Sequence, residues 1–252
     1  MDASPESDWP EAVEILNEDG RSDMVLLCEH ASNHMPAGYG GLGLEARHLS
    51  RHIAWDIGAA GVTRRLSAKL DAPAFLGTYS RLLIDLNRPL DAADSIPARS
   101  ESTDIPGNAG IGETERARRA AVMFTPFHDA VARHLDARQA AGRPTRIVTI
   151  HSFTPVFLGA ARPWHAGVLY DRAKSLGEAI LAGLRADPSL NVGANVPYDI
   201  GADSDYAVPV HGGRRGIEAV LVEIRQDLLA DDAGMEEWAG RMAAALAPLR
   251  EA

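Results

Sequence analysis

Two histidines in this chain follow apolar runs that are typical of buried β-strands. The run VLLC at 25–28 is followed by Glu29 and His30, and the run RIVTI at 146–150 leads directly to His151. Because open α/β folds build their sites at the carboxyl ends of parallel strands, we expect both imidazoles at one edge of one sheet. Imidazole is the commonest nitrogen ligand of zinc, so the pair predicts a divalent metal site, with zinc as the expected ion.

A third ligand of this metal site should be a carboxylate. Asp56 is preferred, because residues 45–70 have the apolar spacing of a helix that enters the cleft after the first strand. Glu29 and Asn33 flank His30 and stay open as alternatives, although Glu29 alternates with His30 along an extended chain. The structural alternative for Asp56 is an ion pair with His52, four residues earlier.

A further carboxylate, Glu223, lies near the end of the apolar run 219–224. A carboxyl group that is partly shielded from water has a raised pKa and can accept a proton from water, which makes Glu223 the expected general base. The alternative is a structural ion pair between Glu223 and Arg225. Cys28 is close to His30, but a cysteine inside VLLC is more often a small buried hydrophobic residue than a nucleophile.

Several basic and amide side chains are candidates for binding a carboxylate of the substrate. The segment SRLLIDLNRP contains two arginines, and guanidinium groups bind carboxylates through two parallel hydrogen bonds. Asp85 in the same segment can hold one of them in place. Ordinary surface arginines would explain the same pattern. The substrate-binding candidates are Arg81, Asn87, Arg88, His211 and Arg225.

The order of predicted elements indicates a single α/β domain over residues 1–252. Strands are expected at 24–28, 72–76, 146–151, 191–196 and 219–224, and helices at 45–70, 113–141, 173–184 and 235–249. Such alternation predicts a mostly parallel, mixed sheet with helices on both faces. Residues 1–22 form an acidic lead, residues 81–89 end a strand or form a loop, and residues 92–112 form a long surface loop that we expect to act as a lid or substrate loop.

The composition excludes several classes of protein. The formal net charge of −10 argues against a nucleic-acid partner, because phosphate binding requires a basic surface. No run reaches the roughly 18 apolar residues of a membrane span, and the N-terminus lacks the basic and apolar regions of a signal peptide. A single cysteine excludes an internal disulfide and fits a reducing compartment, so a cytoplasmic location is expected.

Five short motifs, in this order, resemble those of the N-formylglutamate amidohydrolase family over residues 24–229: EHASNH, HIAWDIGA, SRLLIDLNRP, TIHSFTP and LVEIRQDL. The resemblance implies a hydrolase fold similar to that of the zinc carboxypeptidases. It also implies metal-dependent hydrolysis of a small acidic N-acyl amino acid, such as N-formylglutamate, to formate and the amino acid. Carboxypeptidases commonly take two ligands from an HxxE motif, whereas the residue three after His30 is Asn33.

The resemblance also implies roles for individual residues. His30, Asp56 and His151 would hold the metal, Glu223 would be the general base, and the arginines of SRLLIDLNRP would bind the substrate carboxylates. Two alternatives stay open. One is a deacylase or peptidase that acts on another N-acyl amino acid or a cell-wall-like fragment, and the other is a non-catalytic protein that binds acidic metabolites.

Overall fold

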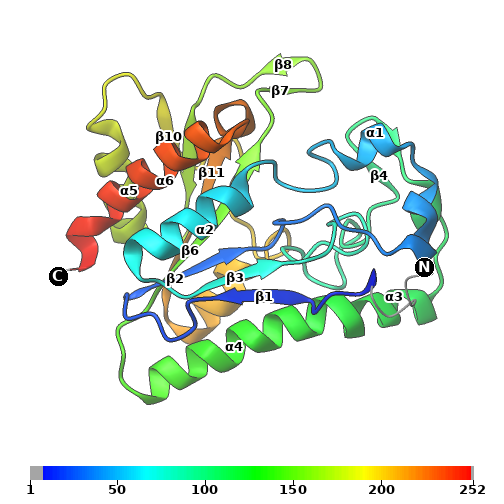
Figure 1. Ribbon diagram of the computed structural model, residues 1–252, viewed down its shortest axis with the longest axis horizontal. Coiled ribbons are helices and arrows are strands. Elements are labelled where there is room, and N and C mark those ends of the chain that lie inside the picture. The colour runs from blue at the N-terminus through cyan, green and yellow to red at the C-terminus, as the bar shows by residue number, and fades with distance from the viewer. Residues whose placement is uncertain (1–7, 251–252) are drawn as a thin grey trace.

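A seven-stranded mixed sheet organises residues 8–250, the part of the chain that this computed structural model describes (Figure 1). The strand order is β1-β3-β2-β6-β11-β9-β10. The pairs β2–β3, β2–β6, β6–β11 and β9–β10 are parallel, and β1–β3 and β9–β11 are antiparallel. The strands are β1 (Val13–Leu16), β2 (Met24–Cys28), β3 (Ala74–Gly77), β6 (Arg146–Phe153), β9 (Ala166–Leu169), β10 (Val192–Ala194) and β11 (Glu218–Arg225).

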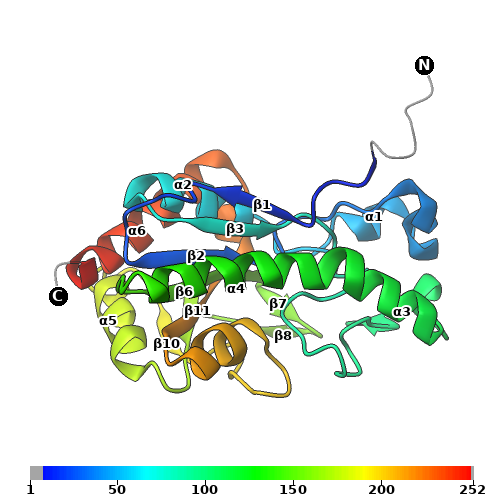
Figure 2. The same cartoon turned by 90° about the horizontal axis from the view of Figure 1, so that it is seen from below.

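Helices cover both faces of this sheet, as the sequence predicts. Figures 1 and 2 show α4 along one face, while α2, α5 and α6 lie on the other. The central strands β2, β6 and β11 are therefore buried on both sides and consist of nearly unbroken apolar runs. The helices are α1 (Ala46–Leu49), α2 (Ala59–Leu70), α3 (Glu113–Arg119), α4 (Thr125–Ala140), α5 (Lys174–Arg185) and α6 (Asp232–Leu246).

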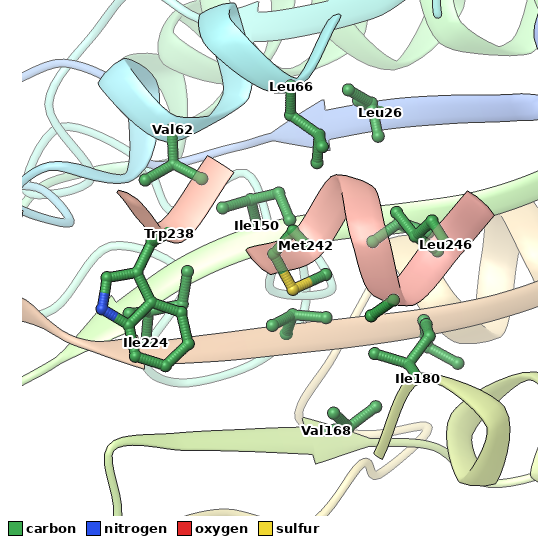
Figure 3. Packing of buried hydrophobic residues seen from close by; sticks show 14 of the residues in the cluster. Leu26, Val62, Leu66, Ile150, Val168, Ile180, Ile224, Trp238, Met242 and Leu246 are labelled. Carbon is green, nitrogen blue, oxygen red and sulfur yellow. The ribbon is translucent and has the colours of Figure 1, made fainter. Parts of the chain in front are cut away.

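The apolar side chains form one core on each side of the sheet. On the first side, Val62 and Leu66 of α2 meet Trp238 and Met242 of α6 above the strands (Figure 3). On the second side, Phe127, Val131 and Leu135 of α4 share one core with apolar residues of β2, β3 and β6. Alternate residues of each central strand thus enter different cores. His151 and Glu223 follow the register of the residues that face the α4 side, since Ile147 and Leu221 belong to that core.

The helix predicted at 45–70 is wrong in its middle part. Only α1 and α2 are helical, and residues 50–58 form turns. Gly58 has a left-handed φ of 81°, and a Cβ atom there would lie 2.3 Å from Leu229 Cβ, so the chain needs glycine where it turns into α2. The Asp56 backbone N–H donates to the His30 carbonyl at 3.0 Å, which holds this turn against the end of β2.

Other predicted elements agree more closely. Strand β2 has the predicted bounds, and the long helix at 113–141 is present as α3, a π turn at Ala120–Phe124 and α4. The π turn precedes Pro126, which has no N–H to donate to the helix. Strand β9 is not predicted by the sequence pattern, and the acidic segment 1–22 contains strand β1. Residues 81–89 form turns rather than a strand.

The predicted loop 92–112 contains short elements of its own. Strands β4 (Arg99–Ser100) and β5 (Thr103–Asp104) pair with each other, and a turn of 3-10 helix follows at Pro106–Asn108. Ser95, Ile96, Ile105 and Asn108 are buried, so this segment is packed against the rest of the protein. Over the described residues, no helix has the length and apolar character needed to cross a membrane.

Candidate active site

A cavity of about 490 Å³ opens beside the carboxyl ends of β2, β6 and β11. Turns 50–58 and 80–88, segment 94–101 and residues 198–205 complete its wall. The predicted residues that line it are His30, Asp56, Arg81, Asn87, Arg88, His151 and Glu223. Residues that are up to about 190 positions apart in sequence therefore meet at one end of the sheet, where open α/β folds place their sites.

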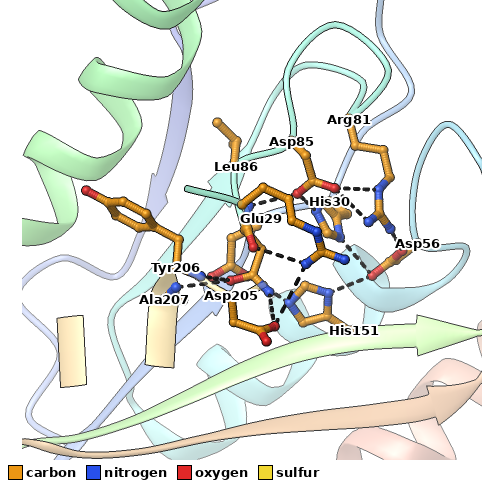
Figure 4. Close-up of polar contacts among 12 residues, drawn as sticks. Glu29, His30, Asp56, Arg81, Asp85, Leu86, His151, Asp205, Tyr206 and Ala207 are labelled. Atoms are coloured by element: carbon orange, nitrogen blue, oxygen red, sulfur yellow. Dashed lines mark hydrogen bonds and ion pairs between the residues drawn. The ribbon is translucent and has the colours of Figure 1, made fainter. Parts of the chain in front are cut away.

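His30, Asp56 and His151 form a buried cluster in this cavity (Figure 4). One ligand atom from each residue lies within 4.8 Å of the other two. Both histidines turn Nδ1 toward the same carboxylate oxygen: Asp56 Oδ2 is 3.3 Å from His30 Nδ1 and 2.8 Å from His151 Nδ1. Two imidazole nitrogens and one carboxylate oxygen that converge in this way make a donor set that suits a divalent ion such as zinc.

The outer nitrogens of the same two histidines also contact carboxylates. His30 Nε2 lies 2.6 Å from Asp85 Oδ1, and His151 Nε2 lies 3.0 Å from Glu29 Oε2. Histidines that bind a metal usually donate their second ring N–H to a carboxylate, which fixes the tautomer and orients the ring. The contacts of both rings therefore fit a metal held through Nδ1.

The charges around the cluster favour a cation at its centre. Burial opposes ionisation of Asp56, yet the contacts with His30 and His151 hold the pKa of this carboxyl well below its ordinary value. Burial also disfavours a charged His151, but its hydrogen bonds to Asp56 and Glu29 raise the pKa of the ring well above 6.5. The buried carboxylates thus stabilise positive charge at the position where an ion would sit.

Glu29 and Asn33, the alternative ligands, have other partners. Glu29 Oε2 accepts hydrogen bonds from Thr149 and His151, and these contacts, against the opposing effect of burial, lower the pKa of Glu29 to about 2. Asn33 Nδ2 donates to the Leu49 carbonyl at 2.9 Å. Cys28 is fully buried in the apolar core, and burial raises the pKa of its thiol well above the ordinary value, so a thiolate nucleophile is disfavoured.

Glu223 lies beside His151 across the parallel pair β6–β11, where the two residues are in register. Its side chain is nearly buried, and Oε2 forms no hydrogen bond with any described residue. Burial is the main reason that the pKa of Glu223 rises from 4.5 to about 7, and the charge of His151 partly opposes the rise. A carboxyl group with this pKa can both accept and donate a proton near neutral pH.

The predicted substrate-binding residues of SRLLIDLNRP line the cavity, but their side chains already form hydrogen bonds and ion pairs with other groups of the protein. Arg81 Nη1 is 3.2 Å from Asp56 Oδ1, and Arg81 Nη2 is 2.7 Å from Asp85 Oδ2. Arg88 pairs with Asp94 at 3.0 Å and also donates to the Ser204 carbonyl. The Asn87 amide donates to Asp205 and accepts from two backbone N–H groups. These contacts position the walls of the cavity.

Two of the predicted substrate-binding residues lie outside the cavity lining. His211 is buried against His128, with 2.9 Å between His128 Nδ1 and His211 Nε2. Arg225 ends β11, and its guanidinium pairs with Asp227 at 2.8 Å because the chain turns into a short 3-10 helix after the strand. The ion pair between Glu223 and Arg225, the structural alternative, is absent among the described residues, because Arg225 pairs with Asp227.

Sequence reasoning missed several residues of the site. Asp85 and Glu29 contact the outer nitrogens of the histidines, whereas the sequence indicated Asp85 only as a partner of an arginine and Glu29 only as an alternative ligand. Their positions next to predicted site residues were the available signal. Tyr198 and Asp205, which come from loops, and Arg99, which comes from the short strand β4, also line the cavity, and no local pattern reveals them.

Comparisons with known proteins show the family and the fold that this chain resembles. The model of the family described as N-formylglutamate amidohydrolase matches residues 22–230, which include all the candidate residues. A gene product of Agrobacterium tumefaciens with a solved structure is 41% identical, with a TM-score of 0.92 over 97% of this chain and 98% of that one. The N-formylglutamate amidohydrolase of Ralstonia eutropha is 18% identical, with a TM-score of 0.70 over 96% and 98%, and shares the fold. No curated protein matches.

Proposed function

This chain belongs to the N-formylglutamate amidohydrolase family, and on that premise we propose that it is a divalent-metal-dependent hydrolase of N-formylglutamate or a similar acidic N-acyl amino acid. The family relationship makes it a hydrolase of amide bonds. The metal, the substrate and the roles of individual residues are the content of the proposal. The products of the named reaction are formate and glutamate.

The observation that carries the proposal is the arrangement of the two histidines. Each directs Nδ1 to Asp56 and Nε2 to a separate buried carboxylate. A metal site requires donor atoms that lie close together and histidine rings that are oriented by carboxylates at their second nitrogens, and a structural histidine pair requires neither. In the proposal, His30, Asp56 and His151 hold the ion. When bound, the ion would polarise the scissile carbonyl and make a water molecule easier to deprotonate.

Glu223 carries the proton in the proposed reaction. Its free oxygen, Oε2, faces no competing donor among the described residues, so it can accept a proton from the attacking water. The same carboxyl group then donates this proton to the nitrogen of the leaving amino acid. A pKa near 7 allows both transfers at neutral pH without a large free-energy cost in either direction.

Arg81 holds two carboxylates of the site in position. Its guanidinium bridges Asp56 and Asp85, and this position fixes both carboxylates relative to His30. The segment 92–112 contributes Asp94, Arg99 and Glu101 to the cavity wall, which supports a role as a substrate loop.

The experiment that tests the proposal measures formate release. The purified protein is loaded with zinc and incubated with N-formyl-L-glutamate, and formate and glutamate are quantified in parallel. Equal release of both, lost after chelation and restored by zinc, would support the proposal. If the protein hydrolyses only a different N-acyl amino acid, that compound would replace N-formylglutamate as the proposed substrate. Ligand binding without any product would favour the non-catalytic binder of acidic metabolites.

A further inference from the structure

Arg162 is a positively charged residue beside the cavity, and it has no role in the reaction proposed above. It directly follows the hairpin of β7 (Val156–Phe157) and β8 (Ala160–Ala161), which projects from the end of the sheet in Figure 1. Its guanidinium carbon lies 4.5 Å from the ring centroid of Phe157 and 4.8 Å from that of Tyr198. Both of these aromatic side chains line the cavity.

Arg162 differs from the two arginines near the metal cluster in its partners. Arg81 and Arg88 each form ion pairs with aspartates. Within residues 8–250, no ion pair joins Arg162 to a carboxylate. Its guanidinium donates from Nη1 to Thr154 Oγ1 at 3.4 Å and also contacts the Tyr198 phenol. Aromatic rings hold a guanidinium in place without occupying its N–H donors, so most donors of Arg162 stay available for a ligand.

Tyr198 connects Arg162 with the reacting end of the cavity. Tyr198 and Glu223 line the same cavity, and the Tyr198 ring contacts the Arg162 guanidinium, with 4.8 Å between the ring centroid and the guanidinium carbon. A ligand that extends from Glu223 along Tyr198 would approach the guanidinium of Arg162.

We propose that Arg162 binds the side-chain carboxylate of an acidic N-acyl amino acid. This inference rests on the proposed function, because it assigns a part of the same substrate. The α-carboxylate is two bonds from the scissile nitrogen and must stay close to the metal cluster. Arg162 contacts none of the cluster residues, and its partners are Thr154 and the aromatic side chains of the wall. The more distant side-chain carboxylate fits this position.

The experiment compares two ligands that differ only in that charge. N-acetyl-L-glutamate and N-acetyl-L-glutamine are titrated into the zinc-loaded protein by calorimetry. A charge-assisted, two-point contact predicts that the wild type prefers the glutamate ligand by about ten- to a hundredfold. Arg162→Gln should abolish this preference mainly by lowering the affinity for N-acetyl-L-glutamate. Arg162→Lys should retain part of the preference because lysine keeps the charge.

Arg241→Gln is the matched control. The Arg241 guanidinium also lies over an aromatic ring, 5.4 Å from the centroid of Trp238, but it pairs with Asp187 and lies outside the cavity lining, so this variant should keep the preference. A wild type without preference, or an Arg162→Gln variant that keeps it while its melting temperature matches the wild type, would overturn the inference. If Arg162→Gln unfolds, an Arg162→Lys variant with the full wild-type preference would also overturn it, because lysine cannot reproduce the two-point contact.

The binding readout separates this inference from the proposed function. Selective binding that depends on Arg162, without formate release from any formyl amino acid, would support the inference and refute the proposed function. Formate release with no role for Arg162 in ligand preference would do the opposite.

Discussion

Replacing Glu223 by glutamine should inactivate the protein and, at alkaline pH, stabilise its metal-free form. The exchange keeps the shape of the side chain but removes its ability to accept a proton. General base catalysis contributes about 10²–10⁴-fold, so the rate of formate release should fall by that factor. Bound metal should stay near the wild-type level, because Glu223 is not one of the three residues that converge on the candidate ion.

The stability effect follows from the raised pKa of Glu223. An unfolded chain ionises this carboxyl above about pH 4.5, whereas the folded, metal-free protein ionises it only above about 7. The folded state is therefore penalised increasingly as the pH rises from 4.5 to 7, and by a constant amount above that. A difference of about 2.5 pKa units at about 1.4 kcal/mol each gives roughly 3 kcal/mol at pH 8 and less than about 1 kcal/mol at pH 5.

Urea unfolding in the presence of a chelator measures this effect, with tryptophan fluorescence as the signal. Glu223→Gln should unfold at higher urea than the wild type at pH 8, and the gain should shrink at pH 5. The value of 3 kcal/mol is an upper bound, because the buried amide still lacks a partner. Glu218→Gln, at the other end of β11 and paired with Arg146, is the control that should leave turnover unchanged. Near-normal activity of Glu223→Gln, or a loss of stability at pH 8, would refute the reasoning.

Three further predictions concern the metal and the histidines. Elemental analysis of protein purified without chelator should find near-stoichiometric zinc or another divalent metal, and His30→Ala and His151→Ala should both lose it; metal retention in either variant would remove that residue from the ligand set. Asp85→Asn should weaken metal affinity by about 10–100-fold in a competition titration, because the carboxylate orients His30; unchanged affinity would contradict this role. Burial lowers the pKa of His128 to about 3 and that of His211 to about 4. Each is neutral in the folded protein, so the unfolded chain takes up protons below about pH 6.5 and each histidine should destabilise the protein by about 2 kcal/mol at pH 5 relative to pH 7.5. Urea unfolding should show that His128→Gln loses about 2 kcal/mol less stability between pH 7.5 and pH 5 than the wild type does. The same pH dependence in the variant and the wild type would contradict the lowered pKa of His128.

Local patterns predicted the elements that bring the histidines together. Strand β2 has its predicted bounds, and β6 carries His151 as expected. Buried central strands are recognisable because both of their faces are apolar and a polar residue at the end is conspicuous. Strand β9 lacks this clarity, since its four residues are AGVL and carry little β-propensity.

The position of Asp56 shows where local patterns fail. The apolar spacing over 45–70 predicts one helix, yet Asp56 lies in a turn that is held by a backbone hydrogen bond to His30 and by the close approach of Gly58 to Leu229. The predicted helix is the reason for preferring Asp56 as the third metal ligand, and that reason is wrong, because residues 50–58 form turns. The Asp56 carboxylate reaches both histidines because of the turn.

The sequence by itself determined the α/β class, the buried strands with histidines at their carboxyl ends, and the family. These features depend on hydrophobic periodicity and on short motifs, which are properties of neighbouring residues. Only the tertiary structure decided which carboxylate meets which histidine nitrogen, that Arg81 binds Asp56 and Asp85, and that Arg225 pairs with Asp227. The contact between His151 and Asp56 joins residues 95 positions apart, and such contacts follow from how the turns pack together, which no local pattern records.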